Sequence, residues 1–328
     1  MKALRWQVAV IVAASLVFPL VIRSDYYQHV LILALMWVVI GSSWNLLAGY
    51  TGQVSFGHAI FFGIGAYTAG ICATKAGMSA WWGMILGGPM AALIGFVIGW
   101  VCFRLRGPYF ALATIAVGEI FRLVAVVWRS FTGGMQGILL MQSFRSKLPY
   151  YYLALFLALA CIYVIHVLMR SKWGYYFIAI REDQDAAESM GVNAFRYKSL
   201  SLIVSAFFTG TTGAFYMNYM AFIDPEVVFS LHHISIMAIL VGIIGGVGTL
   251  WGPPLGAFIM VLLQEMFRSS FFGLAPRWVS ELHVLVFGLL VIFVILYMAN
   301  GIVGDWGKIQ RLWSSKAGGG ASAAGKGS

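Results

Sequence analysis

The chain has 328 residues, of which 61% are hydrophobic and only 10% are charged, and its formal net charge at pH 7 is +10. Soluble domains carry about 25% charged residues, so this composition excludes a water-soluble globular protein and indicates a membrane protein. The positive charge is not gathered on one face with interleaved aromatic side chains, and no nucleic-acid partner is therefore expected.

Long apolar stretches follow one another along the whole chain, separated by short polar segments. About 20 apolar residues cross the hydrocarbon core of a bilayer as a helix, and lipid offers no partner for an unpaired backbone group. The sequence therefore predicts an all-α fold, a polytopic transmembrane helical bundle of about ten spans, with a range of nine to eleven. The predicted spans are 6–22, 27–47, 54–74, 81–103, 109–128, 151–169, 199–221, 232–247, 254–268 and 282–299.

The ninth predicted span, 254–268, is short and follows Gly252 and two prolines. This pattern indicates a broken or re-entrant segment in place of a full crossing. We interpret residues 1–313 as one transmembrane domain in which 170–198 is the longest loop. Residues 314–328 are rich in Gly, Ala and Ser and are expected to form a disordered tail.

The distribution of Lys and Arg predicts how the bundle is oriented. Cytoplasmic loops near span ends are enriched in these residues. With ten spans and the N-terminus inside, most of the 21 Lys and Arg residues fall on the inner side. We therefore expect both termini and the 170–198 loop in the cytoplasm, and the 133–147 loop outside.

The sequence does not indicate an enzyme. Cys72, Cys102 and Cys161 lie far apart inside predicted spans without metal-ligand spacing, which predicts neither a disulfide nor a zinc site. Residues 320–326 fit a phosphate-binding loop, but Gly327 stands where Ser or Thr is needed. We expect no catalytic residue, cofactor or metal here, and any ATP hydrolysis must occur on another polypeptide.

Residues 45–59 place several polar side chains between two apolar spans, together with three glycines that allow a sharp break. Polar groups at membrane depth are tolerated where they face protein or a water-filled cavity, and discontinuous helices often line a solute path. The segment therefore predicts a translocation path, and the alternative is a short loop with a close helix contact. The candidate path residues are Asn45, Gln53, Ser55, Phe56, His58 and, from the fifth span, Glu119.

A second glycine-rich junction spans residues 240–257. At a constant offset of 193, Gly49 and Gly52 of the first junction match Gly242 and Gly245, which is typical of repeat-built transporters. Gly248, Gly252 and Gly256 also form a ladder of small residues, so close helix packing is the alternative explanation.

The loop between the sixth and seventh spans contains a short predicted helix at 182–190. Acidic residues stand at its N-terminal end and Gly191 follows its C-terminal end, as helix termini favour. A helix this short is marginal in water, so a partner surface is expected to complete it; a solvated loop is the alternative.

Four segments of the sequence, taken together, resemble the LivM branch of the branched-chain amino acid ABC permeases, and the resemblance extends over residues 27–300. They are 45–59, 105–114 with Gly118 and Glu119, 132–137, and 245–253. Residues 185–191 also resemble the E-A-A-x-x-x-G coupling motif of ABC importers, with Asp185 in place of Glu. Residues 298–304 depart from the Pro-x-Gly-Leu pattern that this family often shows near the last span.

The resemblance implies an ATP-driven importer of branched-chain amino acids or similar small solutes in the bacterial inner membrane. The implied partners are a second related permease subunit, two cytoplasmic ATP-binding subunits, an extracytoplasmic solute-binding protein and membrane lipid. It further implies that Asp185, Ala186, Ala187, Glu188 and Gly191 couple the chain to the ATPase, with the small alanines docking in a groove. The alternatives are a secondary transporter, which would use intramembrane groups such as Glu119 and Arg122, and an ABC permease for urea, amides or small organic acids.

Overall fold

The computed structural model describes residues 24–144, 146–268 and 301–304, together with Ser15, Pro19 and Gly288. The long helices are α2 (Asp25–Asn45), α3 (His58–Thr74), α4 (Ala80–Cys102), α5 (Pro108–Val127), α7 (Leu148–Arg170), α8 (Lys172–Glu182), α10 (Ala194–Met220), α12 (Met237–Gly245) and α13 (Gly252–Arg268). The short helices are α6 (Arg129–Thr132), α9 (Gln184–Ser189), α11 (Pro225–Val228) and α15 (Gly301–Gly304). Helical turns of other pitch are η1 (Leu46–Tyr50), η2 (Gly134–Gln136) and η3 (Leu231–Ile236).

The described chain is almost entirely helical, which confirms the predicted class. Its one sheet is an antiparallel pair of two-residue strands, β1 (Ile138–Leu139) and β2 (Phe222–Ile223). Six segments of the described residues are long and apolar enough to cross a membrane. They are Asp25–Tyr50, Ala80–Cys102, Pro108–Val127, Leu148–Arg170, Ala194–Met220 and Pro225–Gly245.

The predicted count of about ten spans is not confirmed. The helices α3 and α13 have 17 residues each and are shorter than the six segments above. The predicted spans 6–22 and 282–299 fall outside the described residues except for Ser15, Pro19 and Gly288, and the predicted tail 314–328 lies wholly outside them.

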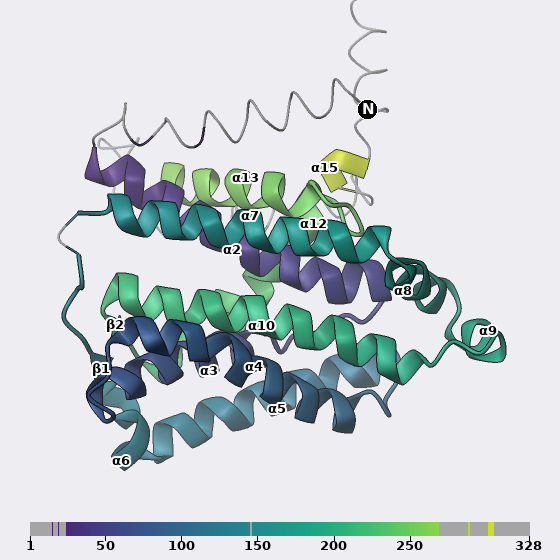
Figure 1. Ribbon diagram of the computed structural model, residues 1–328, viewed down its shortest axis with the longest axis horizontal. Coiled ribbons are helices and arrows are strands. Elements are labelled where there is room, and N and C mark those ends of the chain that lie inside the picture. The colour runs from purple at the N-terminus through teal and green to yellow at the C-terminus, as the bar shows by residue number, and fades with distance from the viewer. Residues whose placement is uncertain are drawn as a thin grey trace, which may run out of the picture.

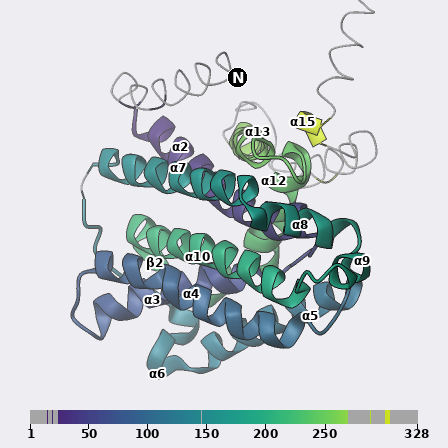
Figure 2. The same ribbon diagram turned by 45° about the vertical axis from the view of Figure 1, so that its right-hand side comes forward.

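The helices form two layers (Figure 1). One layer contains α2, α7, α12 and α13, and the other contains α3, α4, α5 and α10, with α2 and α10 in contact between them. The same separation is visible after a 45° turn (Figure 2). In the most apolar stretch of each span, 83% of the residues are buried for Asp25–Tyr50 but only 17% for α5. The helix α5 therefore presents most of its surface to whatever surrounds this chain.

Close backbone contacts hold α3, α4 and α10 together. A Cβ atom added at Gly65 of α3 would overlap the carbonyl oxygen of Gly210 in α10, and one added at Gly213 would overlap that of Phe62. Lipid is as apolar as a leucine side chain, so helices in membranes associate through such van der Waals packing of small residues. These glycines therefore set the close packing of α3 on α10.

Two breaks interrupt the helices where the sequence predicts glycine-rich junctions. The first break, 52–57, follows η1, and Gly52 has a φ of +70°, which delays the start of α3 to His58 instead of residue 54. The second break, 246–251, separates α12 from α13, and Gly248 has a φ of +75°. Gly256 packs directly on the backbone of α12, which supports the close-packing explanation for the small-residue ladder.

The loops lie at two ends of the bundle, which α7 separates by about 34 Å at 1.5 Å per residue. One end holds α8 and α9, and the other holds the β1–β2 pair (Figure 1). Lys75 donates to the backbone of Ser130 and Lys147 to that of Asp25 at this second end. The 170–198 and 133–147 loops are thus at opposite ends, as the sequence predicts.

Candidate functional site

Asn45 fastens the end of α2 to the second break. Its side-chain Nδ2 donates to the carbonyl oxygen of Thr249 at 2.8 Å, and its Oδ1 accepts from the backbone N–H of Gly248 at 2.7 Å. Gly49 lies directly beneath, because a Cβ there would overlap Asn45 Oδ1 and approach the Gly248 nitrogen to 2.5 Å. Both polar atoms of the Asn45 amide are therefore bonded inside the subunit.

Ser55 and His58 are also buried and bonded within the chain. The Ser55 carbonyl oxygen accepts from Trp44 Nε1 at 2.9 Å, and its hydroxyl accepts from the Gly57 N–H at 3.1 Å. His58 Nε2 lies 2.8 Å from the Ser205 hydroxyl and has no exposed surface. These partners change our expectation for Asn45, Ser55 and His58, since polar groups at membrane depth that bond inside the fold shape it.

Gln53 and Phe56 belong to the first break and are neither fully buried nor fully exposed. Both are partly exposed, and Gln53 Nε2 reaches the Thr51 carbonyl oxygen at 3.4 Å. The backbone N–H of Phe56 donates to the Thr114 hydroxyl of α5 at 3.1 Å. The first break is therefore tied to α5, and Gln53 and Phe56 are the candidate path residues of this segment whose side chains are partly exposed.

A cluster of three charged side chains lies on the outer face of α5 and α11. Arg122 Nε lies 3.0 and 3.1 Å from the two carboxylate oxygens of Glu119, and its Nη1 also bonds Glu226. The sequence predicts the Glu119–Arg122 pair from their spacing on one helix, but not Glu226, which lies 104 residues away. Glu226 lies between the predicted spans 199–221 and 232–247, and no feature of the sequence linked it to Arg122.

This charged cluster lies at membrane depth. Glu119 is about 16 Å from the start of α5, a helix about 30 Å long at 1.5 Å per residue. Its exposed neighbours on α5, Ile120, Leu123 and Val127, are apolar. A charge that faces lipid at such depth is expensive, so this face is completed by protein or by water.

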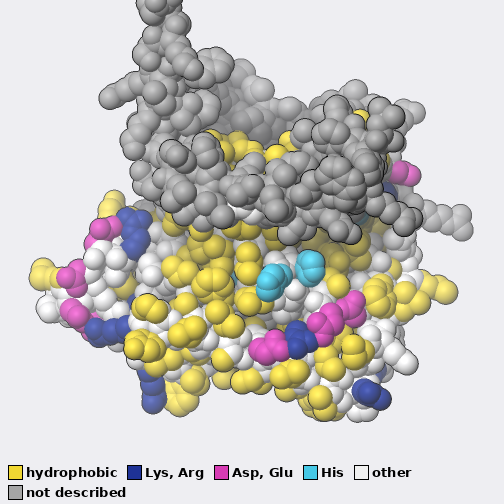
Figure 3. Space-filling model, turned by 180° about the vertical axis from the view of Figure 1, so that it is seen from behind, with side chains coloured by type: hydrophobic (Ala, Val, Ile, Leu, Met, Phe, Trp, Pro, Cys, Tyr) yellow, Lys and Arg dark blue, Asp and Glu magenta, His cyan; other side chains and the backbone are white. Residues whose placement is uncertain are grey.

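Two histidines extend the same polar area. His232 and His233 are exposed on η3, which contacts both α5 and α11. Figure 3 shows acidic, basic and histidine side chains gathered on an otherwise hydrophobic face. The sequence left these histidines unassigned, because their proximity to α5 follows only from the tertiary packing.

The short helix predicted at 182–190 exists as α9, Gln184–Ser189. The Asp183 side chain accepts from the Ala186 N–H at 3.0 Å and caps the N-terminus, and Asp185 supplies a carboxylate to the first turn. Gly191 ends the segment with a φ of +86°, as the sequence predicts. We refer to residues 183–191 as the coupling segment.

The two alanines of α9 differ in orientation. Ala187 is only 6% exposed and packs inside the chain with Ile180 and Ala194, whereas Ala186 is exposed and Met190 is 86% exposed. The expectation that both alanines dock in a partner groove therefore needs a correction. Ala187 supports the helix from within, because α9 lies against α8 and α10 on that side.

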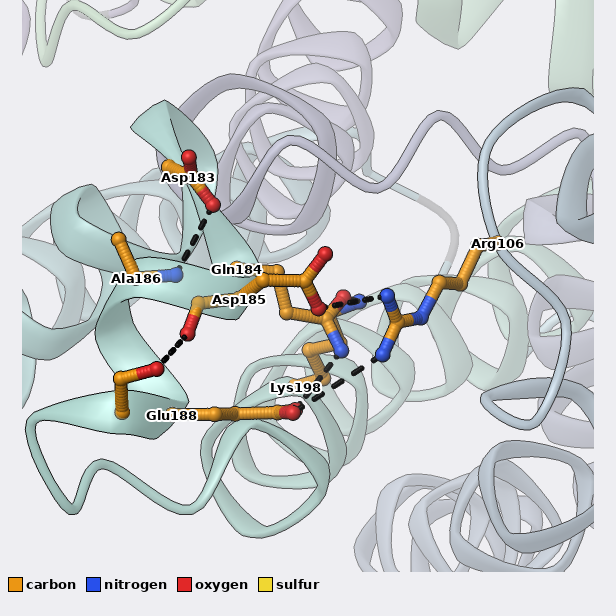
Figure 4. Close-up of polar contacts among 8 residues, drawn as sticks. Arg106, Asp183, Gln184, Asp185, Ala186, Glu188 and Lys198 are labelled. Atoms are coloured by element: carbon orange, nitrogen blue, oxygen red, sulfur yellow. Dashed lines mark hydrogen bonds and ion pairs between the residues drawn. The ribbon is translucent and has the colours of Figure 1, made fainter.

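Ionic and polar contacts hold α9 against the rest of this end of the bundle (Figure 4). Arg106, from the loop between α4 and α5, lies 2.7 Å from Asp185 and 3.9 Å from Glu188. The buried Lys198 donates to the Gln184 side chain at 2.5 Å. The exposed Arg106 pairs contribute about 0–1 kcal/mol each, so they orient α9 without fixing it rigidly.

Cysteines and acidic side chains do not gather into a metal site in the part of the chain that the structure describes. Cys102 and Cys161 are buried, Cys72 is partly buried, and all three are free thiols. Cys161 lies 3.8 Å from the Ser43 hydroxyl in the core. Their surroundings are those of packing residues.

The similarity of the chain to known proteins extends over the regions described above. The profile of the family "Branched-chain amino acid transport system / permease component" matches residues 26–295. The chain belongs to this family. The match spans both breaks, the charged cluster and the coupling segment, and it confirms the resemblance that the sequence motifs predict.

Individual relatives are permease proteins. LivM of Escherichia coli (strain K12), a high-affinity branched-chain amino acid transport permease, is 26% identical and covers 83% of this chain and 68% of its own length. LivH of the same organism is 24% identical over 81% of this chain and 93% of its own. A fructose import permease of Rhizobium meliloti is 24% identical over 65% of this chain and 61% of its own. No solved structure matches the chain.

Proposed function

We propose that this chain is the membrane permease subunit of an ATP-driven importer that carries branched-chain amino acids or similar small solutes across the bacterial inner membrane. The observation that carries the proposal is the charged cluster of Glu119, Arg122 and Glu226 on an otherwise apolar, uncovered face. Family membership supports transport as the purpose of that face. An amino acid carries an ammonium and a carboxylate, so its route needs polar groups at this depth.

The translocation path runs along the face formed by α5, α11 and η3, between this chain and a second related permease subunit. The low burial of α5 supports this location, since a lipid-facing helix would not carry the charged cluster. The similarity of the chain to both LivM and LivH supports a partner of related sequence. Glu119 lines the path, Gln53 and Phe56 border it, and Asn45, Ser55 and His58 maintain the break behind it.

The coupling segment contacts one of two cytoplasmic ATP-binding subunits. Asp185, Ala186, Glu188 and Gly191 form its exposed surface, and Ala187 anchors it from the inside. This assignment puts the α8–α9 end and both termini in the cytoplasm, in agreement with the Lys and Arg distribution. An extracytoplasmic solute-binding protein then delivers the solute at the β1–β2 end.

Two alternatives are weighed by specific observations. The fructose import permease among the relatives supports a wider substrate range within similar sequences. A permease for urea, amides or small organic acids therefore stays an alternative. A secondary transporter would need a carboxylate that exchanges protons or ions, and both acids of the charged cluster are instead paired with Arg122. The family match favours the ATP-driven importer.

Transport by the complex in proteoliposomes tests the proposal. The chain is purified with its partner subunits, and radiolabelled leucine uptake is measured with ATP, without ATP, and with an imposed ion gradient alone. We expect uptake that requires ATP and the solute-binding protein. Uptake driven by the ion gradient without ATP would contradict the proposal, and ATP-dependent uptake of urea but not leucine would change the substrate.

A further inference from the structure

Arg181 connects the coupling segment to both helix breaks. It lies in the last turn of α8, and only Glu182 separates it from Asp183, which caps α9. The Nη1 of its side chain donates to the carbonyl oxygen of Gly49 at 3.0 Å. A residue beside the coupling segment thus reaches the end of the α2–η1 helix.

Glycines at both breaks leave the room that Arg181 occupies. A Cβ atom at Gly52 would lie 3.1 Å from Arg181 Cγ and 3.3 Å from its Cα, and one at Gly248 would lie 3.0 Å from its Nη1. The side chain therefore lies against the first break along its stem and against the second break at its guanidinium. Asn45, at the end of α2 and beside Gly49, also bonds to the second break.

The position of the guanidinium has a clear electrostatic reason. Gly49 belongs to the last turn of the α2–η1 helix, where carbonyl groups lack intrahelical partners and carry the negative end of the helix dipole. A guanidinium that donates to such a carbonyl forms a charge-assisted hydrogen bond, and Glu182 holds Arg181 Nε at 3.0 Å. This hydrogen bond is directional. A movement of α9 would alter it, because Arg181 lies in the last turn of α8, which leads directly into α9.

We infer that Arg181 is the positioning residue that transmits movement of the coupling segment to the paired breaks. In this state it holds the first and second breaks together. Docking or withdrawal of an ATP-binding subunit tilts α9, which moves the last turn of α8 and changes the separation of the breaks behind the path. This inference rests on the proposed function, and it names the residue that links ATP hydrolysis to the membrane part of that function.

The test compares Arg181→Gln with Arg196→Gln in the assembled importer. Arg196 is the matched control because it is an exposed arginine of the same loop region. Leucine uptake and ATP hydrolysis are measured in the same proteoliposomes. We expect Arg181→Gln to keep its ATP-binding subunits and at least half of its ATP hydrolysis, while leucine carried per ATP falls about tenfold. Arg196→Gln should match the wild type.

A spectroscopic readout separates transmission from general stability. Spin labels at positions 53 and 247, one at each break, should change their separation on ATP binding in the wild type and not in Arg181→Gln. If Arg181→Gln is not recovered from membranes, Arg181→Lys carries the same test, because lysine keeps the charge but loses the planar fork. We then expect a smaller loss of leucine per ATP, of about threefold.

The outcomes are distinguishable. An unchanged ratio of leucine to ATP in the Arg181 variant overturns the inference and leaves the proposed function intact. Loss of the ATP-binding subunits from the variant, or an equal fall of uptake and hydrolysis, also overturns it, because Arg181 would then serve docking or folding. A wild-type complex without ATP-dependent uptake refutes the proposed function, and the inference with it.

Discussion

In the part of the chain that the structure describes, the polar groups beside the breaks and the charged cluster of α5 and α11 both lie at membrane depth, and they are bonded in opposite ways. At the breaks, Asn45 and His58 are buried and bond to groups of the same chain, 147 to 204 residues away. On α5 and α11, Glu119 and Glu226 pair with Arg122, but about half of each carboxylate side chain stays exposed. Buried polar groups of this kind define the fold, whereas exposed ones at this depth indicate what lies outside the subunit.

The largest expected effect is on the interior, at Gly49. Replacement of Gly49 by Ala places a Cβ against Asn45 Oδ1 and 2.5 Å from the Gly248 nitrogen, so η1 and the second break must separate. We expect a loss of about 3 kcal/mol, the upper range for overpacking, seen as a lower melting temperature of the purified subunit in detergent. Gly118→Ala is the control, because its Cβ would meet only Ile60, at 3.8 Å. Equal melting temperatures for the two variants would contradict the close packing of Gly49 on the second break.

Asn45→Ala should have the next largest effect. The change leaves the Gly248 N–H and the Thr249 carbonyl without their partner in a buried site. The expected loss is about 2 kcal/mol, within the range for unsatisfied buried groups. Leucine uptake should fall only in proportion to the amount of folded protein. An Asn45→Ala variant with normal stability but much slower leucine uptake would instead show that Asn45 lines the translocation path.

The neighbouring alanines of α9 give a smaller but sharper contrast between buried and exposed positions. Ala187→Trp overfills the contact with Ile180 and Ala194, and we expect the isolated subunit to lose about 1 kcal/mol of stability. Ala186→Trp projects from the exposed side and should leave the subunit unchanged but prevent co-purification of the ATP-binding subunits. The reverse pattern would mean that α9 presents the other face.

The charged cluster should show the smallest effect on stability and a clear effect on transport. Glu119→Gln removes a charge from an exposed position, so the free energy of unfolding should change by no more than about 0.5 kcal/mol, with a correspondingly small shift of the melting temperature. Leucine uptake should fall about tenfold, the scale of one lost charge-assisted hydrogen bond. The control is Leu86→Ala on the exposed apolar surface of α4, which should retain uptake. Unchanged uptake in Glu119→Gln would remove the cluster from the path.

Local features of the molecule could be predicted from the sequence because their causes are local. Hydropathy gives most helices, the glycines mark both breaks, and Asp185 and Gly191 mark the termini of α9. The number of spans was harder to predict, since two helices of 17 residues have lengths near the limit for a crossing.

Contacts between distant segments could not be predicted in this way. The offset of 193 pairs Gly49 with Gly242, but the structure packs Gly49 against Gly248 and Gly242 against Trp44. The polarity of Asn45 was visible, while its bonds to the second break depend on tertiary packing. For the same reason, the burial of Ala187 and the meeting of Glu226 with Arg122 follow only from the folded chain.

Accessibility of single cysteines to a water-soluble thiol reagent tests the contrast between the two places most directly. In the assembled importer with Cys72, Cys102 and Cys161 replaced by Ala, a cysteine is placed at position 119 or at position 58. We predict that the cysteine at 119 reacts and that leucine transport conditions slow its labelling, whereas the cysteine at 58 does not react in folded protein. Rapid, leucine-protected labelling at 58, with none at 119, would contradict the account.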